Sequence, residues 1–143
     1  MSGHVATART QVAAPPGQVW QALTDPGLIE QYMMGSRVET DWQVGSPITW
    51  SGEFDGKPYQ DKGEVVTVEP PRVLAVTHYS PLMGAEDKPE SYHLVRYELT
   101  PSGEDGTTIS LIQDGCDSPE QAEQFSQNWQ GMLEGLKSVV ERA

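Results

Sequence analysis

The stretch SPEQAEQFSQNWQGMLEGLKSVV, residues 118–140, decides the fold of this chain. Its apolar residues recur at steps of three and four, namely Ala122, Phe125, Trp129, Met132, Leu133, Leu136, Val139 and Val140. That spacing predicts one amphipathic helix of about six turns, or roughly 35 Å at about 1.5 Å per residue. Ser118, Pro119 and Gln121 have the types and spacing of a capping box with a first-turn proline. A helix this long with so wide an apolar stripe has to lie along a sheet.

The residues before this helix show the period-two alternation of β-strands. Strands are expected at residues 4–13, 37–42, 47–54, 60–69, 73–79, 91–99 and 107–114. Short turns rich in glycine and proline separate most of them, so neighbouring strands are expected to be antiparallel. One longer link, residues 81–89, is expected to arch over an edge of the sheet.

Two short helices are expected between the first strand and the second. Pro16 suits a first helical turn, and Val19, Trp20 and Leu23 follow it at helical spacing. The pair Asp25-Pro26 ends that helix and begins another that extends to about residue 32. The fold class is therefore α+β, with one domain over residues 1–143. A curved antiparallel sheet of about six to seven strands is expected to wrap around the long C-terminal helix.

Charge and composition narrow the classes of partner. The net charge is −12, from 21 acidic against 9 basic residues, and a surface this negative repels phosphate backbones and anionic membranes. Nucleic acid and membrane insertion are therefore not expected, and no apolar run approaches the roughly 20 residues of a membrane span. Cys116 is the only cysteine, which excludes an intramolecular disulfide and suits a reducing cytoplasm. The cytoplasm is the expected location.

Several motifs resemble one known superfamily. The segment VWQALTDP, residues 19–26, following APP at residues 14–16, resembles the opening motif of the START-like (SRPBCC) superfamily. GEVVTVEPPRVL at residues 63–74 and YELTP at residues 97–101 support the branch named for the heat-shock-protein-90 ATPase activator. The resemblance implies the helix-grip fold. The superfamily includes carriers of lipids and hormones, polyketide cyclases and co-chaperone-like domains, so it leaves function open.

A ligand cavity is expected between the sheet and the long helix. Strand parity and helix spacing select the candidate ligand-binding residues Trp42, Trp50, Tyr97, Gln113, Phe125, Trp129 and Met132, and Met33 is added because it lies beside a predicted loop at the open end. Plain core packing remains the alternative for each of them. Met33, Met34 and Met83 are placed at the open end, where methionine suits adaptable apolar contacts.

Three hypotheses for function follow. The favoured one is a module that binds an apolar small molecule, such as a lipid, an aromatic or a polyketide-like compound. The first alternative is a co-chaperone-like protein-interaction domain tied to stress response, acting through its acidic surface. The second is a cyclase- or hydrolase-like enzyme, which needs an inward-facing acid or base such as His93 or Glu64. No cofactor, metal site or catalytic residue is assigned, because His78 and His93 lack further ligands nearby and Cys116 lacks a histidine close in sequence. The chain is expected to be a monomer or a homodimer.

Overall fold

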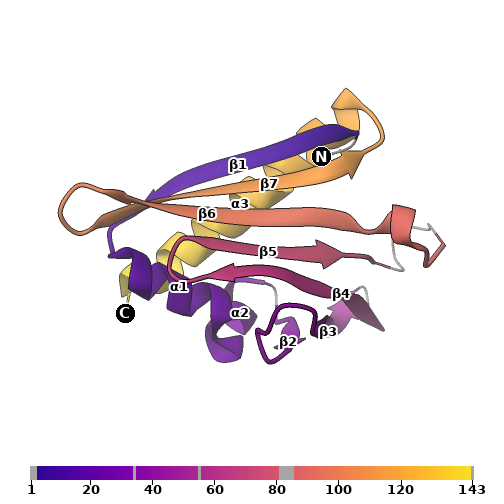
Figure 1. The fold of residues 1–143 in the computed structure, drawn as a ribbon, viewed down its shortest axis with the longest axis horizontal. Coiled ribbons are helices and arrows are strands. Elements are labelled where there is room, and N and C mark those ends of the chain that lie inside the picture. The colour runs from indigo at the N-terminus through magenta and orange to yellow at the C-terminus, as the bar shows by residue number, and fades with distance from the viewer. Residues whose placement is uncertain (1–2, 34, 55, 81–85, 143) are drawn as a thin grey trace.

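The computed structural model describes residues 3–33, 35–54, 56–80 and 86–142. One sheet of seven strands has the order β1-β7-β6-β5-β4-β3-β2, with every pair antiparallel. The elements are β1 (His4–Val12), α1 (Pro16–Thr24), α2 (Pro26–Tyr32), β2 (Arg37–Glu39), β3 (Pro47–Phe54), β4 (Lys57–Glu69), β5 (Val73–His78), the 3-10 helix η2 (Pro89–Ser91), β6 (His93–Ser102), β7 (Gly106–Cys116) and α3 (Pro119–Arg142). Figure 1 shows α3 lying along one face of the sheet, with α1 and α2 at the end where α3 finishes.

The helix ends form where the sequence places their caps. Asp25 ends α1 and caps α2, because its Oδ1 accepts hydrogen bonds from the backbone N–H groups of Gly27 and Leu28 at 2.8 and 3.2 Å. At the start of α3, Ser118 Oγ accepts from the N–H of Gln121 at 3.1 Å. The Gln121 side chain reaches back to the N–H of Asp117.

Polar side chains of α3 cover the outer edge of strand β1. Ser126 Oγ and Gln130 Oε1 accept from the N–H groups of Thr7 and Arg9, at 3.0 and 3.1 Å. Further along the helix, Lys137 Nζ donates to the carbonyl of Gln11 at 2.8 Å. Backbone groups that would otherwise form an open sheet edge are thereby satisfied within the chain.

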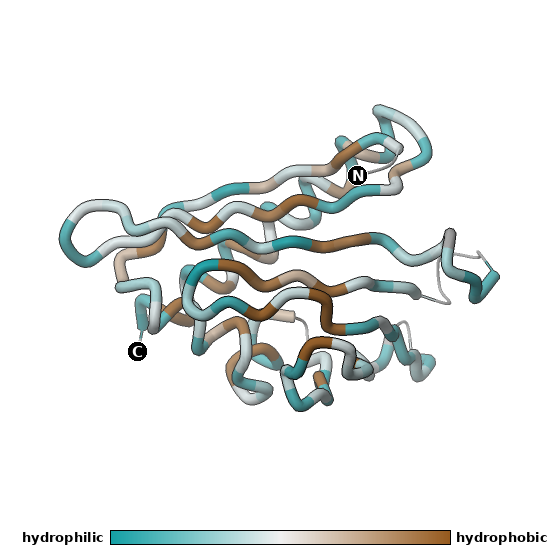
Figure 2. Tube along the Cα trace, viewed as in Figure 1, coloured by the Kyte–Doolittle hydropathy of each residue, from teal (hydrophilic) through white to brown (hydrophobic). Residues whose placement is uncertain are grey.

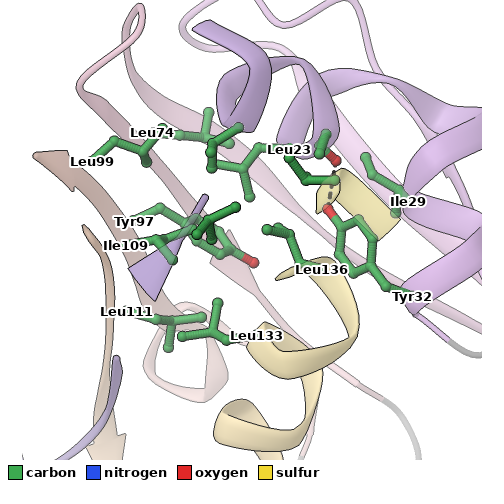
Figure 3. Close-up of a cluster of buried hydrophobic side chains, with 14 of the residues drawn as sticks. Leu23, Ile29, Tyr32, Leu74, Tyr97, Leu99, Ile109, Leu111, Leu133 and Leu136 are labelled. Atoms are coloured by element: carbon green, nitrogen blue, oxygen red, sulfur yellow. Dashed lines mark hydrogen bonds between the residues drawn. The ribbon is translucent and has the colours of Figure 1, made fainter. Parts of the chain in front are cut away.

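The core lies between the sheet and the second half of α3. Figure 3 shows Leu133 and Leu136 of α3 facing Tyr97, Ile109 and Leu111 of the sheet. All five are buried, and Leu133, Leu136, Ile109 and Leu111 have no exposed surface. Hydrophobic residues lie along the middle strands, whereas the hairpin between β6 and β7 is hydrophilic (Figure 2). This core closes one end of the sheet–helix sandwich.

The expected fold is confirmed, with local differences. The strand expected at residues 37–42 ends at Glu39, and the one expected at 91–99 begins at His93 after the short helix η2. The predictions for Met34, for Met83 and for residues 81–85 of the arch concern residues outside those that the structure describes. Among the helices that the structure describes, none has both the length and the apolar character needed to span a membrane.

Candidate functional site

A cavity of about 730 Å³ opens between the sheet and the first half of α3. The sheet contributes residues of β4 to β7, α3 contributes Phe125, Trp129 and Met132, and the segment after α2 contributes Met33. Aromatic and methionine side chains dominate the wall. Polar side chains lie between them, among them Ser36, Asp61, His78, His93, Gln113, Gln127 and Asn128, but the exposed surface of the wall is mainly apolar, as is usual for a small-molecule site.

Seven of the eight predicted site residues line this cavity or its inner recess. Met33, Gln113, Phe125, Trp129 and Met132 line the main chamber, and Trp50 and Tyr97 line the recess. Trp42 does not line either space and packs against the core instead. Strand β2 has already ended at Glu39, and Trp42 adopts a φ of 59°, so strand parity no longer applies at that residue.

The inner recess holds about 70 Å³ and shares Met33, Ser36, Asp61, His78 and Trp129 with the main chamber. Its most polar feature is a pair of side chains from β4 and β5. Asp61 Oδ2 lies 2.9 Å from His78 Nε2, and both side chains are largely buried. The His78 ring also meets the indole of Trp50 edge-on, with ring centroids 5.1 Å apart. Packing thus fixes the imidazole from two sides.

Backbone geometry places this pair. Gly63 lies two residues after Asp61 on β4, so the two residues share one face of the strand. A Cβ at Gly63 would lie only 1.7 Å from the carbonyl oxygen of Thr77 on β5. Only glycine allows the two strands to approach this closely. That close approach brings β4 and β5 together just where they carry Asp61 and His78.

Hydrogen bonds fix two further parts of the wall. The indole N–H of Trp129 donates to Gln113 Oε1, which joins α3 to β7 across the cavity. Gln113 is only 4% exposed, so this bond satisfies a buried amide oxygen. Ser36 and Tyr59 share a hydrogen bond between their hydroxyls, which joins the segment after α2 to β4.

Burial raises the pKa of both the Tyr97 hydroxyl and the Cys116 thiol. Burial raises the pKa of the Tyr97 hydroxyl above its ordinary value, so Tyr97 is a neutral hydrogen-bonding group at physiological pH. The pKa of the Cys116 thiol is also raised, chiefly by burial. Cys116 is 2% exposed and packs with Ala6 and Ala122, away from the cavity wall. A thiol in this state is a poor nucleophile.

Comparisons with known proteins agree on the family. Residues 13–141 match the family model of the Activator of Hsp90 ATPase homolog 1-like protein. The chain belongs to this family. A solved structure from Cytophaga hutchinsonii is 38% identical, with 99% of this chain and 97% of that chain covered and a TM-score of 0.85.

More distant solved structures share the fold. An Hsp90 activator from Plasmodium falciparum is 18% identical, with 97% of each chain covered and a TM-score of 0.74. An Aha1 dimer from Colwellia psychrerythraea is 20% identical, with 96% of each chain covered and a TM-score of 0.73. No curated protein matches the chain. The START-like resemblance expected from the sequence is thereby confirmed.

Sequence reasoning missed Asp61. It considered Glu64 as the inward acid of β4, yet Glu64 is exposed. The signal was present, because Asp61 has the same strand parity as the fully buried Val65 and the opposite parity to Glu64. His78 and His93 do face each other in register across β5 and β6, and both line the cavity. No group of three or more His, Cys, Asp or Glu side chains suited to a metal ion occurs among the described residues.

Proposed function

We propose that this member of the family binds an apolar small molecule in the cavity between the sheet and the first half of α3. The observation that carries the proposal is the cavity itself. Its volume of about 730 Å³ lies within the roughly 300–1,000 Å³ of typical ligand pockets. The wall combines aromatic rings and methionines with polar side chains on a mainly apolar surface, which suits a lipid, an aromatic or a polyketide-like compound.

The two alternatives gain no specific support. The Hsp90 activator and the Aha1 dimer are similar to this chain at 18% and 20% identity, a level that carries the fold and no partner. An enzyme on a hydrophobic substrate stays a hypothesis, although His93 does reach the cavity. Cytoplasmic location and the choice between monomer and homodimer also stay predictions.

The direct test is an amide-shift NMR titration of labelled protein with a panel of lipids, flavonoid-like aromatics and polyketides. We expect saturable shifts that cluster around Met33, Gln113, Trp129 and Met132. Shifts spread evenly over the surface, or no saturable shift with any compound, would overturn the proposal.

A matched pair of variants on α3 separates binding from folding. Met132 is partly buried and lines the cavity, whereas Val139 is 6% exposed and lies in the core outside it. We expect Met132→Ala to weaken the ligand by about tenfold with little loss of stability. We expect Val139→Ala to cost about 2 kcal/mol of stability and to leave the affinity unchanged. Equal effects of the two changes on affinity would contradict a ligand seated against the first half of α3.

A further inference from the structure

The cavity wall that the structure describes carries a carboxylate and two imidazoles but no lysine or arginine cation. Lining residues among those described include no lysine and no arginine, and the single carboxylate is Asp61. The next residue on β4, Lys62, forms an ion pair with Asp87 instead. The Asp87 carboxylate also accepts from the hydroxyl of Tyr92 at 2.7 Å, so the Lys62 ammonium is engaged outside the cavity wall. Asp61 therefore forms no ion pair with a lysine or arginine that the structure describes.

Asp61 is incompletely bonded within the chain. Its Oδ2 has His78 as partner, while its Oδ1 is buried and has no hydrogen-bond partner among the described residues. A buried carboxylate oxygen without a donor is costly, at about 1–3 kcal/mol or more. The torsion that turns a carboxylate is broad and two-fold, so either oxygen can be presented to the recess at little cost. The Asp61 carboxylate is thus an acceptor with spare capacity at the recess wall.

A second polar group lies in the same recess. Tyr97 lines the recess, and no described residue forms a hydrogen bond with its hydroxyl. Figure 3 shows its ring extending from β6 toward α3. Tyr32, by contrast, donates its hydroxyl to the carbonyl of Ala22 at 2.7 Å and is already satisfied. Asp61, His78 and Tyr97 give the recess a polar end with a carboxylate, an imidazole and a hydroxyl, while serines, amides and His93 line other parts of the cavity.

We propose that this polar end binds the head group of the ligand, and that it selects a hydrogen-bond-donating hydroxyl or amine over a carboxylate. This inference rests on the proposed function, because it assigns the chemistry of the ligand held in the same cavity. A hydroxyl or ammonium donates to the Asp61 carboxylate, and a hydroxyl also accepts from Tyr97. A carboxylate head meets the like charge of Asp61 with no lysine or arginine on the described wall to offset it, and selection follows from that repulsion.

The test is a comparison of three ligands with one chain length: decylamine, decanol and decanoate. Each is titrated below its micelle concentration into the labelled wild-type protein, at about 0.15 M salt, where the screening length is about 8 Å. We expect decylamine and decanol to bind at least about tenfold more tightly than decanoate, with shifts at Asp61, His78 and Tyr97. Equal affinity for all three would overturn the head-group selection.

Two carboxylates on β4 provide a matched pair of variants. Asp61→Asn removes the charge in the recess, while Glu64→Gln removes an identical charge from an exposed site on the same strand. We expect Asp61→Asn to lower the preference for decylamine over decanoate by about tenfold. We expect Glu64→Gln to leave it unchanged, because both variants have the same net charge, one unit less negative than the −12 of the wild type. An equal fall in both would show that the general field of the protein, and not Asp61, makes the selection.

The outcomes separate this inference from the function beneath it. If no ligand of the three or of the wider panel gives saturable shifts in the cavity, the proposed function itself fails. If all three bind in the cavity with equal affinity, the function stands and the head-group inference fails. Should Asp61→Asn not fold, Tyr97→Phe takes its place. A selective loss of affinity for decanol over decylamine is then expected, and an unchanged decanol affinity would contradict the role of the Tyr97 hydroxyl.

Discussion

The two ends of α3 face the same sheet, but their apolar side chains differ in how deeply they are buried. In the second half, Leu133, Leu136, Val139 and Val140 are all at most 6% exposed. Nearer the N-terminus of α3, Phe125, Trp129 and Met132 belong to the same apolar stripe but remain only partly buried, over a cavity. The apolar stripe of a helix therefore predicts which face turns inward. It does not predict whether other side chains fill the space opposite that face.

The difference arises from what lies at each end of the sheet. Helices α1 and α2 contribute Leu23, Ile29 and Tyr32 to the core around the second half of α3 (Figure 3). A Cβ at Gly135 would lie 3.4 Å from the Cβ of Tyr32, so α2 and α3 pack closely there. At Gly131, one turn earlier, a Cβ would meet nothing within 4 Å. The short helices thus fill one end and leave a cavity at the other.

The largest effect expected from this contrast is at Leu136. Leu136→Ala removes a side chain with no exposed surface from the filled end, and we expect a loss of about 3 kcal/mol of unfolding free energy. Met132→Ala at the open end should cost less than about 1 kcal/mol, because its neighbours already border open space. Urea unfolding followed by circular dichroism measures both. Similar losses for the two variants would mean that the ends of the helix do not differ as described.

The link between Trp129 and Gln113 should matter less than the core but remain measurable. Trp129→Phe keeps a ring in the cavity wall and removes the N–H that satisfies the buried Gln113 amide. We expect a cost of about 1–2 kcal/mol in unfolding free energy. Adding Gln113→Leu removes the unpaired amide, so the double variant should recover most of that loss. A double variant whose cost is the sum of both single costs would contradict direct coupling across the cavity.

A gain in stability is expected at the open end. Gly131 lies within α3, exposed at the cavity rim, with free space where a side chain would go. Gly131→Ala should therefore stabilise the protein by about 0.5–1 kcal/mol through the higher helix propensity of alanine. Thermal unfolding measures the gain. The same change at Gly135, which approaches Tyr32, is the matched control and should give less. An equal gain in stability at both positions would indicate that α2 and α3 are not closely packed at Gly135.

Periodicity and caps predicted most of the fold, and strand parity with helix spacing predicted much of the cavity wall. The stripe of α3, the alternation of the strands and the Asp25-Pro26 joint are local signals, and each element formed where its signal lay. The failures have local causes too. Trp42 left its expected face because the strand ended three residues earlier, an event that no side-chain pattern marks. The pairing of Asp61 with His78 depends on the register of β4 and β5 and on the close approach at Gly63, which residue types alone do not specify.

The smallest expected effect on stability concerns the hydrogen bonds that connect the residue after β1 to the C-terminal end of α3. The Glu141 carboxylate accepts from Lys137 Nζ at 2.7 Å and from the N–H of Ala13 at 2.8 Å. The hydrogen bond from Lys137, followed by that from Ala13, lowers the pKa of Glu141 below its ordinary value of 4.5. Because the folded pKa is the lower one, the stabilisation is fully present above pH 4.5 and is lost as the pH falls through the folded pKa.

Glu141→Gln keeps an acceptor for Ala13 and removes only the charge. We therefore expect a small deficit in unfolding free energy for Glu141→Gln at neutral pH that disappears in acid, measured by urea unfolding across the pH range. A deficit that persists unchanged in acid would assign this connection to neutral hydrogen bonding, and one that grows in acid would contradict the direction of the pKa shift.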